Sequence, residues 1–304
     1  MYDGKLIVSW EDEGVRIDKY LADNLEDITR NRIQKLIDEK QIKVNDKDIK
    51  SNYKVKENDE IHIVIPEAVE INIEAENIPL DIVYEDEDLL VVNKPKGMVV
   101  HPAPGHYTGT LVNAIMYHCK DNLSGINGEL RPGIVHRIDM DTTGLLVVCK
   151  NDYAHNFLAE QLKEHSITRK YHAIVYNSVK EDDGTVNAPL GRNPSDRKKM
   201  AIVRDGREAV THYHVIDRFK NFSYIECQLE TGRTHQIRVH MTSINHPLLG
   251  DELYGPKTSN FNLQGQTLHA KVLGFVHPRT KEYMEFEVPL PEYFEKLINI
   301  LKNK

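Results

Sequence analysis

The sequence RPGIVHRIDMDTTGLLVVCK, residues 131–150, places a loop of polar and charged side chains directly before an apolar strand. The loop lies between two apolar stretches, IVHRI and GLLVVC, with few residues to spare. Acidic side chains in such a position are expected to be partly buried and held by partners. Arg137 and the threonine hydroxyls that follow it are the nearest candidates for those partners.

The two acids of this loop, Asp139 and Asp141, are compatible with three kinds of chemistry. Paired carboxylates could perform general acid–base work, or they could bind Mg²⁺. A magnesium site would need further ligands, and the sequence has neither a DxDxDG motif nor an acidic cluster nearby. The third interpretation is a lone aspartate that acts as nucleophile or base beside an arginine. The residues alone favour this last interpretation only slightly.

Segments on both sides of the loop predict a mixed α+β domain. Strands are expected over 82–84 and 89–92, and in GLLVVCK, KYHAIVY, AVTHYHVI, SYIECQLE and IRVHM, whereas HNFLAEQLKEH predicts a helix. Cys149 and Cys227 lie inside such apolar segments, so both are expected to be buried thiols. Three cysteines without a CxxC motif favour neither a disulfide framework nor a zinc site.

The character of the chain changes near Pro66, which predicts a small domain, 1–70, followed by a larger one, 71–304. Apolar residues at helical spacing predict a helix over 15–25, and Thr29 is a suitable N-cap for a second helix over 30–39. The strand-like segments QIKVN and EIHIVI follow. Basic side chains should point away from the apolar face of the second helix, where charge alone predicts an ordinary solvated surface. They are Arg30, Arg32 and Lys35.

Composition sets limits on the class of protein. The chain has 304 residues and a net charge of −8, so any contact with nucleic acid must come from local basic patches. The densest basic stretch is NPSDRKKMAIVR, which includes Arg197, Lys198 and Lys199. No apolar run approaches the ~20 residues of a membrane-spanning helix, and the acidic start does not resemble a secretory signal. We therefore expect a cytoplasmic protein without membrane contact.

The segment HRIDMDTTGLLVV resembles the catalytic signature of the RluA/RluD-type RNA pseudouridine synthases, usually HRLDKDTSGL. Met140 and Thr143 replace the frequent lysine and serine. Other segments follow in the order of that family: VNKPKGMVVHP, TRKYHAIV, MAIVRDGREAVTHYHV, LETGRTHQIRVHM, HPLLGDELYG and LHA. The resemblance implies an α+β catalytic domain with a mixed, largely antiparallel sheet. It also implies isomerisation of uridine to pseudouridine in structured RNA, most directly large-subunit ribosomal RNA, without a cofactor or metal.

The resemblance also assigns expected roles to individual residues. Asp139 matches the essential aspartate, Arg238 matches the basic residue paired with it, and Tyr171 matches the tyrosine that stacks on the uracil. Arg137 matches the arginine that fills the helix when the target nucleotide is flipped out. His136 and Thr142 are placed with the substrate-binding residues. Without the resemblance, Tyr171 would be a half-buried core residue, and Arg238 would be an exposed residue on a strand.

The first domain resembles the ribosomal-protein-S4-type RNA-binding domain. The positions that match its pattern are Arg16, Asp18, Leu21, Thr29, Arg30, Ile37, Ile42, Val44, Asn45, Asp59 and Ile61. Lys40, Asp46 and Asn58 stand where that family usually has glycine, and a lysine adopts the left-handed conformation less readily than Asp or Asn. The basic residues of the two domains would then grip structured RNA at two points, which positions the RNA without specifying its sequence.

Two rival functions and one alternative site remain open at this stage. The chain could be an RNA-binding assembly factor without activity, or a magnesium-dependent nuclease that uses Asp139 and Asp141. The fifteen histidines could suggest a metal. However, His235 and His240 would face opposite sides of a strand, so no metal site is expected. The expected partners are ribosomal RNA or pre-ribosomal particles, bound by a monomer.

Overall fold

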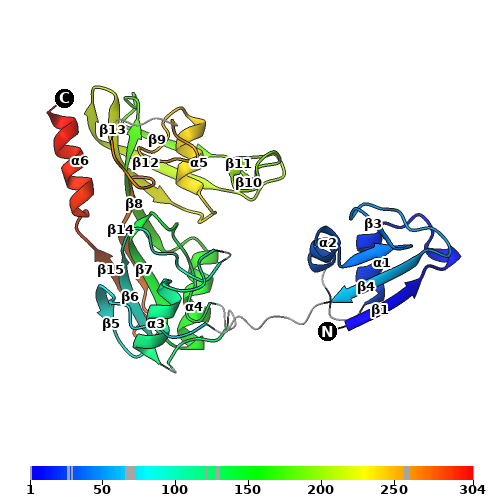
Figure 1. Cartoon of the computed structure of the whole chain (residues 1–304). Helices are drawn as coiled ribbons and strands as arrows, with labels where there is room; N and C mark the ends of the chain where they lie inside the picture. Colours follow the sequence, from blue (N-terminus) through cyan, green and yellow to red (C-terminus); the bar gives the residue numbers. More distant parts are fainter. Residues whose placement is uncertain are drawn as a thin grey trace. The chain divides into compact units, whose positions relative to one another are not determined.

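The computed structural model describes residues 2–25, 28, 30–65, 73–103, 105–120, 122–126, 131–256 and 261–303. The chain forms two compact units, Met1–Ile71 and Asn72–Lys304. Each unit has a hydrophobic core of its own. Figure 1 colours the small unit in blue and the larger unit from cyan to red.

The small unit is a four-stranded antiparallel sheet with two α-helices and one short 3₁₀ helix. Its strands are β1 (Tyr2–Ile7), β2 (Ile42–Val44), β3 (Lys47–Asp48) and β4 (Glu60–Ile65), in the order β1-β4-β2-β3. Its helices are η1 (Trp10–Asp12), α1 (Ile17–Asn24) and α2 (Arg30–Asp38). The two predicted helices and the strands at β2 and β4 are confirmed, whereas β1 was not predicted. Thr29, the expected N-cap, lies outside the described residues.

Three turns of the small unit have other residues where the S4-type domain usually has glycine. Lys40, Asp46 and Asn58 all have the left-handed conformation, with φ of 61°, 59° and 64°. Asp46 and Asn58 adopt the conformation that such residues tolerate, and Lys40 adopts it as well, although a lysine was expected to do so less readily. Lys40 bears the greatest steric cost of the three, and its Nζ lies 2.8 Å from the Asp48 carboxylate on the neighbouring hairpin.

A buried carboxylate joins the two helices of the small unit. Asp18 is 0% exposed and accepts hydrogen bonds from Arg16, Arg30 and Gln34 at 2.9, 3.0 and 2.7 Å. Burial opposes the ionisation of Asp18, but these three donors outweigh it and lower the pKa of the carboxyl. Arg30 therefore has a structural partner, although its side chain stays 48% exposed.

Acid is expected to destabilise the small unit through Asp18. Because the pKa of Asp18 is lowered in the folded state, its contribution is present above the ordinary carboxyl pKa of about 3.9 and is lost as the pH falls below it. Asp18→Asn should cost about 1–3 kcal/mol at pH 7 and should flatten the acid dependence. Urea unfolding between pH 7 and pH 3, followed by hydrogen exchange of β4, measures both effects. Equal pH dependence in both proteins would contradict this account.

The larger unit is built on a nine-stranded mixed sheet, in the order β5-β6-β7-β14-β8-β13-β12-β9, with β15 paired to β14. Only the β7–β14 pair is parallel among the described strands of this sheet. A separate hairpin consists of β10 (Leu190–Arg192) and β11 (Met200–Ile202). The sheet strands are β5 (Ile82–Glu85), β6 (Leu89–Lys94), β7 (Thr143–Cys149), β8 (Thr168–Tyr176), β9 (Asp183–Asn187), β12 (Val210–Phe219), β13 (Phe222–Leu229), β14 (Leu268–Val276) and β15 (Tyr283–Glu287). The predicted mixed, largely antiparallel α+β fold is confirmed.

Helices cover both faces of this sheet. Successive side chains along a strand point to opposite faces, and both sets are apolar in the central strands. On β7, Leu146 and Val148 pack toward α3 (Leu111–Cys119) and α5 (Gln236–Ser243). Leu145 and Val147 pack on the opposite face, toward α4 (Asp152–Lys163). The helix α6 (Glu292–Lys302) covers the part of that second face near β13. Figure 1 shows α5 and α6 on opposite sides of the strands.

The segment IRVHM, predicted as a strand, is the helix α5 instead. Its apolar residues Ile237, Val239 and Met241 are all buried, and so are Arg238 and His240 between them. A helix that is buried on several sides can have alternating apolar and polar residues, a pattern typical of a strand, because its polar side chains also have partners inside the protein. The predicted solvent-facing alternative for Arg238 is therefore wrong.

Two further expectations concern the cysteines and membrane-spanning helices. Cys149 and Cys227 are free and buried in strands, as predicted. Within the described ranges, no helix combines the length and the apolar character that crossing a bilayer requires.

Candidate active site

A cleft of about 690 Å³ lies on the α5 side of the large sheet. Its walls come from the loop 135–142, from β8, and from the segment 232–238 that leads into α5. Asp139, Tyr171 and Arg238, which are far apart in sequence, all line it. The structure thus brings together the three residues that the sequence assigned to catalysis.

Buried groups fix the loop that carries Asp139. Lys94, at the end of β6, is 1% exposed, and its Nζ donates to the carbonyl oxygens of Pro95, Met98 and Met140 at 2.8, 2.8 and 2.9 Å. Burial lowers the pKa of Lys94 to about 7, against the opposite effect of the nearby loop carboxylates. The amide of Gly97 also donates to the Met140 carbonyl, at 3.0 Å. The predictions omitted Lys94, although a lysine that ends the apolar run LLVVN was a visible signal.

Gly144 lets the loop enter the sheet. Its φ is +108°, and a Cβ at this position would lie 2.2 Å from the carbonyl oxygen of Ala270 on β14. Ala270 is the parallel partner of Gly144 in the β7–β14 pair. A side chain would push these strands apart, so glycine is required where the loop becomes a strand.

Arg238 links Asp139 to a second, fully buried carboxylate. Its Nη1 donates to Asp139 Oδ2 at 2.9 Å, while its Nε and Nη2 donate to the two oxygens of Asp251 at 2.7 and 2.9 Å. The side chains of Asp139, Arg238 and Asp251 are 19, 8 and 0% exposed. Burial alone would lower the pKa of Arg238, but the two carboxylates raise it. The predicted contact between Arg238 and Asp139 is confirmed, and Asp251, in the HPLLGDELYG segment, was missed.

His235 completes the surroundings of Asp139. It precedes α5 in the left-handed conformation, with φ of 56°, and its Nε2 lies 3.9 Å from Asp139 Oδ1. Its Nδ1 is hydrogen-bonded to the Tyr254 hydroxyl at 2.8 Å. Burial lowers the pKa of His235, against the effect of Asp139, which favours the neutral ring. The Tyr254 ring also stacks on the Arg238 guanidinium, with 5.1 Å between guanidinium carbon and ring centre.

Asp141 does not line the cleft. Its Oδ1 is buried without a hydrogen-bond partner, and burial raises its pKa despite Lys96 and Lys94 nearby. The threonine hydroxyls do not hold the acids, contrary to expectation: Thr142 accepts from Gln266 at 3.1 Å, and Thr143 pairs with His269 at 2.8 Å. The arrangement therefore favours a lone carboxylate over a pair.

The predicted substrate-binding residues of the loop have mixed surroundings. Arg137, Thr142 and His136 all line the cleft. However, Nε2 of His136 accepts the Val147 amide at 3.1 Å, and burial lowers the pKa of His136 to about 3. Arg137 is exposed, and its Nη1 donates to His101 Nε2 at 3.2 Å. Burial lowers the pKa of His101 to about 4, so a neutral ring accepts this bond at neutral pH.

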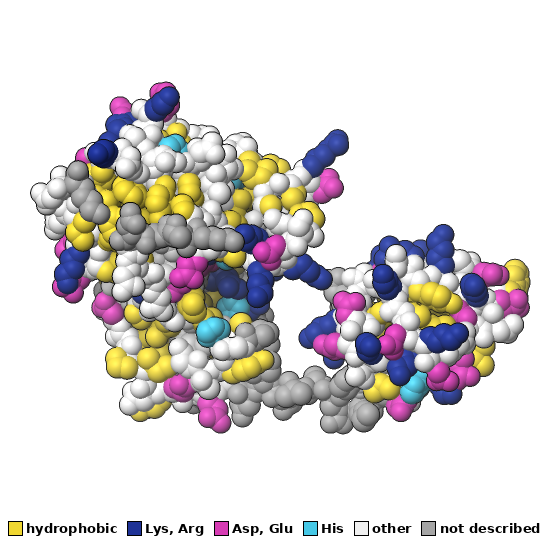
Figure 2. Space-filling model, turned by 45° about the horizontal axis from the view of Figure 1, so that its top comes forward, with side chains coloured by type: hydrophobic (Ala, Val, Ile, Leu, Met, Phe, Trp, Pro, Cys, Tyr) yellow, Lys and Arg dark blue, Asp and Glu magenta, His cyan; other side chains and the backbone are white. Residues whose placement is uncertain are grey.

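The cleft is strongly basic. Asp139 is the single carboxylate among the described residues that line it. Figure 2 shows Lys, Arg and His side chains around a hollow of the larger unit. Besides the predicted residues, the cleft is lined by Arg131, Lys163, Arg169, Arg207 and Arg233. Sequence reasoning missed these five because they come from separate segments.

The predicted basic stretch lies elsewhere. Arg197, Lys198 and Lys199 follow β10 in its hairpin and are not among the residues that line the cleft. In the small unit, Arg30 contacts Asp18, Arg32 lies on α2, and Lys35 lies 3.6 Å from Glu39.

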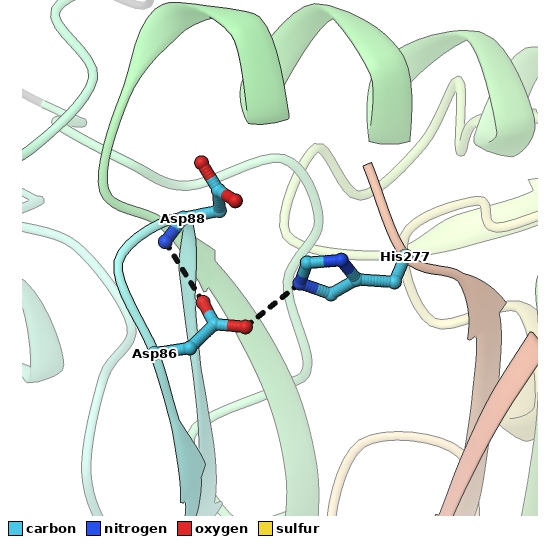
Figure 3. A group of neighbouring side chains, drawn as sticks. All are labelled: Asp86, Asp88 and His277. Atoms are coloured by element: carbon cyan, nitrogen blue, oxygen red, sulfur yellow. Dashed lines mark hydrogen bonds and ion pairs between the residues drawn. The ribbon is translucent and has the colours of Figure 1, made fainter. Parts of the chain in front are cut away.

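One group of side chains outside the cleft has the composition of a metal site: Asp86, Asp88 and His277 (Figure 3). Nδ1 of His277 accepts the amides of Arg279 and Thr280, both at 3.2 Å, so its proton lies on Nε2 and is donated to Asp86 at 2.7 Å. Arg279 donates to both oxygens of Asp88 at 2.6 and 2.8 Å. The group therefore joins two turns by hydrogen bonds.

The other histidines in question have protein partners. His240 contacts the Thr211 hydroxyl and the Ala188 carbonyl at 2.9 and 3.0 Å. His212 and His214 lie 2.6 and 2.8 Å from Glu230 and Asp183, and His246 contacts the Tyr176 carbonyl at 3.0 Å. The expected structural role of these histidines agrees with these contacts.

Comparison with known proteins agrees with this architecture. The family model described as RNA pseudouridylate synthase matches residues 88–243, and the S4 domain model matches residues 15–61. The chain is 56% identical to the uncharacterized RNA pseudouridine synthase YlyB of Bacillus subtilis (strain 168), over 98% of both chains. It is 48% identical to the ribosomal large subunit pseudouridine synthase D of Zymomonas mobilis, over 95% of this chain and 94% of that one. The solved structure of human RNA pseudouridylate synthase domain containing 1 has the same fold, with a TM-score of 0.58 and 24% identity over 76% of this chain and 97% of that one.

A chain that combines a basic cleft containing one carboxylate with a domain of the S4 type has the composition of an RNA-modifying enzyme. The chain belongs to the RNA pseudouridine synthase family and is an RNA isomerase.

Proposed function

We propose that the chain converts specific uridines of large-subunit ribosomal RNA to pseudouridine, with Asp139 as the essential catalytic residue. The observation that carries this proposal is the lone carboxylate of a basic cleft, fixed by Arg238 at 2.9 Å. The name of the Zymomonas mobilis relative, a ribosomal large subunit pseudouridine synthase, supports the choice of RNA.

The residues of the cleft suit the chemistry of this isomerisation. The bond from ribose C1′ to N1 of uracil breaks, the base turns, and a bond from C1′ to C5 forms while the C5 proton is exchanged for one on N1. Asp139 acts as nucleophile or as base toward the ribose or uracil. The reaction needs no group donor, and we propose that it proceeds without cofactor or metal.

Access to the uridine requires that its base leave the RNA stack, at a cost of a few kcal/mol. Tyr171 offers a stacking surface worth about 1–3 kcal/mol, on the wall of the same cleft as Asp139. Arg137 is exposed at the cleft and would enter the space left by the flipped base. His136 and Thr142 would shape the wall against which the nucleotide lies.

The two domains divide the work in this proposal. Residues 1–70, with Arg30, Arg32 and Lys35, hold structured RNA or a pre-ribosomal particle, and residues 71–304 perform the isomerisation. Arg197, Lys198 and Lys199 contact RNA outside the cleft. We propose that the enzyme works as a monomer in the cytoplasm.

The direct test incubates the purified chain with unmodified ribosomal RNA in EDTA and maps pseudouridine by carbodiimide adducts and primer extension. We expect new stops with the wild type, because chelation by EDTA removes no component of the proposed mechanism. We expect none with Asp139→Ala, because that variant lacks the catalytic carboxylate. Shortened RNA that requires magnesium would instead identify a nuclease. Stops on transfer RNA but not on ribosomal RNA would refute the proposed substrate. Intact RNA without stops on either would indicate a binding protein.

A further inference from the structure

Arg169 is a buried cation without a counter-ion. Its side chain lies on β8 and lines the cleft, yet the residue is only 5% exposed. One of its terminal nitrogens, Nη2, donates to the Glu230 carbonyl at 2.7 Å, while Nε is buried with no hydrogen-bond partner. An arginine guanidinium offers five N–H donors, so most of the donors of Arg169 make no hydrogen bond within the described residues.

Burial is the main factor that disfavours the charge on Arg169. It lowers the pKa of Arg169, Tyr171 acts in the opposite direction, and Arg233 adds to the lowering. In the part of the chain that the structure describes, no carboxylate lies within ion-pair distance of Arg169. A buried guanidinium without a partner costs several kcal/mol and is retained only where an opposite charge compensates it. An anion that enters the cleft from outside would supply the missing opposite charge.

The local backbone makes room for the Arg169 side chain at the wall of the cleft. Gly232 packs against the Arg169 fork, and a Cβ on Gly232 would lie 2.5 Å from Nη1 of Arg169. Arg233 follows directly and is anchored by its Nε to the Glu208 carbonyl at 2.9 Å. Two arginines thus meet on this wall of the cleft, which suits a tetrahedral anion with several acceptor oxygens.

The position of Arg169 indicates which anion it meets. Arg169 and Tyr171 are two residues apart on β8, so their side chains leave the same face of the sheet about 6.6 Å apart along the strand. If Tyr171 stacks on the target uracil, as proposed above, Arg169 lies within one nucleotide of that base. We propose that Arg169, assisted by Arg233, binds a backbone phosphate that flanks the flipped uridine. This subsite rests on the proposed function and adds the feature that fixes the register of the RNA strand in the cleft.

The test measures how salt weakens the binding of fluorescein-labelled octauridylate to the full chain, by fluorescence anisotropy. Each phosphate contact with single-stranded RNA contributes about 0.7 to the slope of log affinity against log salt. We expect Arg169→Gln to lower the slope by about 0.7 and to weaken binding at low salt by about tenfold. Arg169→Lys should keep the slope because it keeps the charge. Lys220→Gln, which removes one charge from the β12–β13 turn outside the cleft, should have the wild-type slope.

A second readout requires only the unmodified chain to fold. The Nε–Hε NMR signal of Arg169, assigned by its loss in Arg169→Lys, should shift as octauridylate is added. An unchanged slope in a folded Arg169→Gln protein, or an unmoved signal at saturation, would overturn the phosphate site. These binding results do not depend on turnover. If Arg169→Gln lowers the salt slope but the wild type forms no pseudouridine, the proposed reaction alone is refuted. If the wild type forms pseudouridine but Arg169→Gln has the wild-type salt slope, the phosphate site alone is refuted.

Discussion

Asp139→Asn is expected to lower the rate of pseudouridine formation by about 10³-fold or more, with little effect on RNA affinity. The asparagine keeps the size of the side chain and can still accept a hydrogen bond from Arg238, so the cleft should keep its shape. It lacks the negative charge that a nucleophile or base requires. Single-turnover assays on the RNA identified by adduct mapping give the rate, and anisotropy with the same RNA gives the affinity.

Asp141→Asn is the matched control for this prediction. Asp141 belongs to the same loop but does not line the cleft, and burial already raises its pKa toward the neutral form. The substitution should therefore retain turnover within about tenfold. A loss as large as that of Asp139→Asn would restore the interpretation of paired carboxylates. Full activity in Asp139→Asn would end the proposal of a catalytic Asp139.

Asp251→Ala is expected to destabilise the larger unit by about 3–5 kcal/mol, because it leaves the Arg238 guanidinium buried with one of its two partners missing. Turnover should also fall, since Arg238 would no longer be held in line with Asp139. Urea unfolding gives the stability, and the same single-turnover assay gives the rate. A loss below about 1 kcal/mol would show that solvent reaches the pair.

A double substitution separates the two effects. Asp251→Leu with Arg238→Met replaces the buried ion pair by apolar groups of similar size, which in other proteins is often neutral or stabilising. We expect stability to return only in part, because the amides of Leu253 and Tyr254 lose their acceptor on Asp251, while turnover stays low because Asp139 has lost its partner. Recovery of turnover together with stability would mean that Arg238 serves the fold alone.

Much of the fold could be predicted because its signals are local. The strands at β6, β7, β8 and β13 read as apolar or alternating runs, and α4 reads as an amphipathic helix. The left-handed positions Lys40, Asp46 and Asn58 were identified through the resemblance, as places where glycine is usual, and the structure shows that all three residues adopt that conformation. The helix α5 could not be predicted, because burial on several sides removes the contrast on which periodicity depends.

The candidate site could be predicted only in part, for a related reason. Asp139, Tyr171 and Arg238 were found by their resemblance to a known signature, and their meeting in one cleft needed the tertiary structure. Asp251 and Lys94 act through contacts that span 13 and 46 residues of sequence, so no local pattern reveals them. The basic wall of the cleft is also hidden in the sequence, because a net charge of −8 says nothing of where the arginines gather.

The Arg238 fork has a consequence for how the enzyme meets its substrate. One guanidinium holds Asp139 on one side and Asp251 on the other, and Asp251 is fully buried before any RNA arrives. The reactive carboxylate is therefore preorganised when the chain folds, and no reorientation of its dipole has to accompany each encounter. Under the proposed function, the free energy of RNA binding can be used to extract the base, and we expect the flipping of the nucleotide, rather than the assembly of the site, to discriminate among uridines.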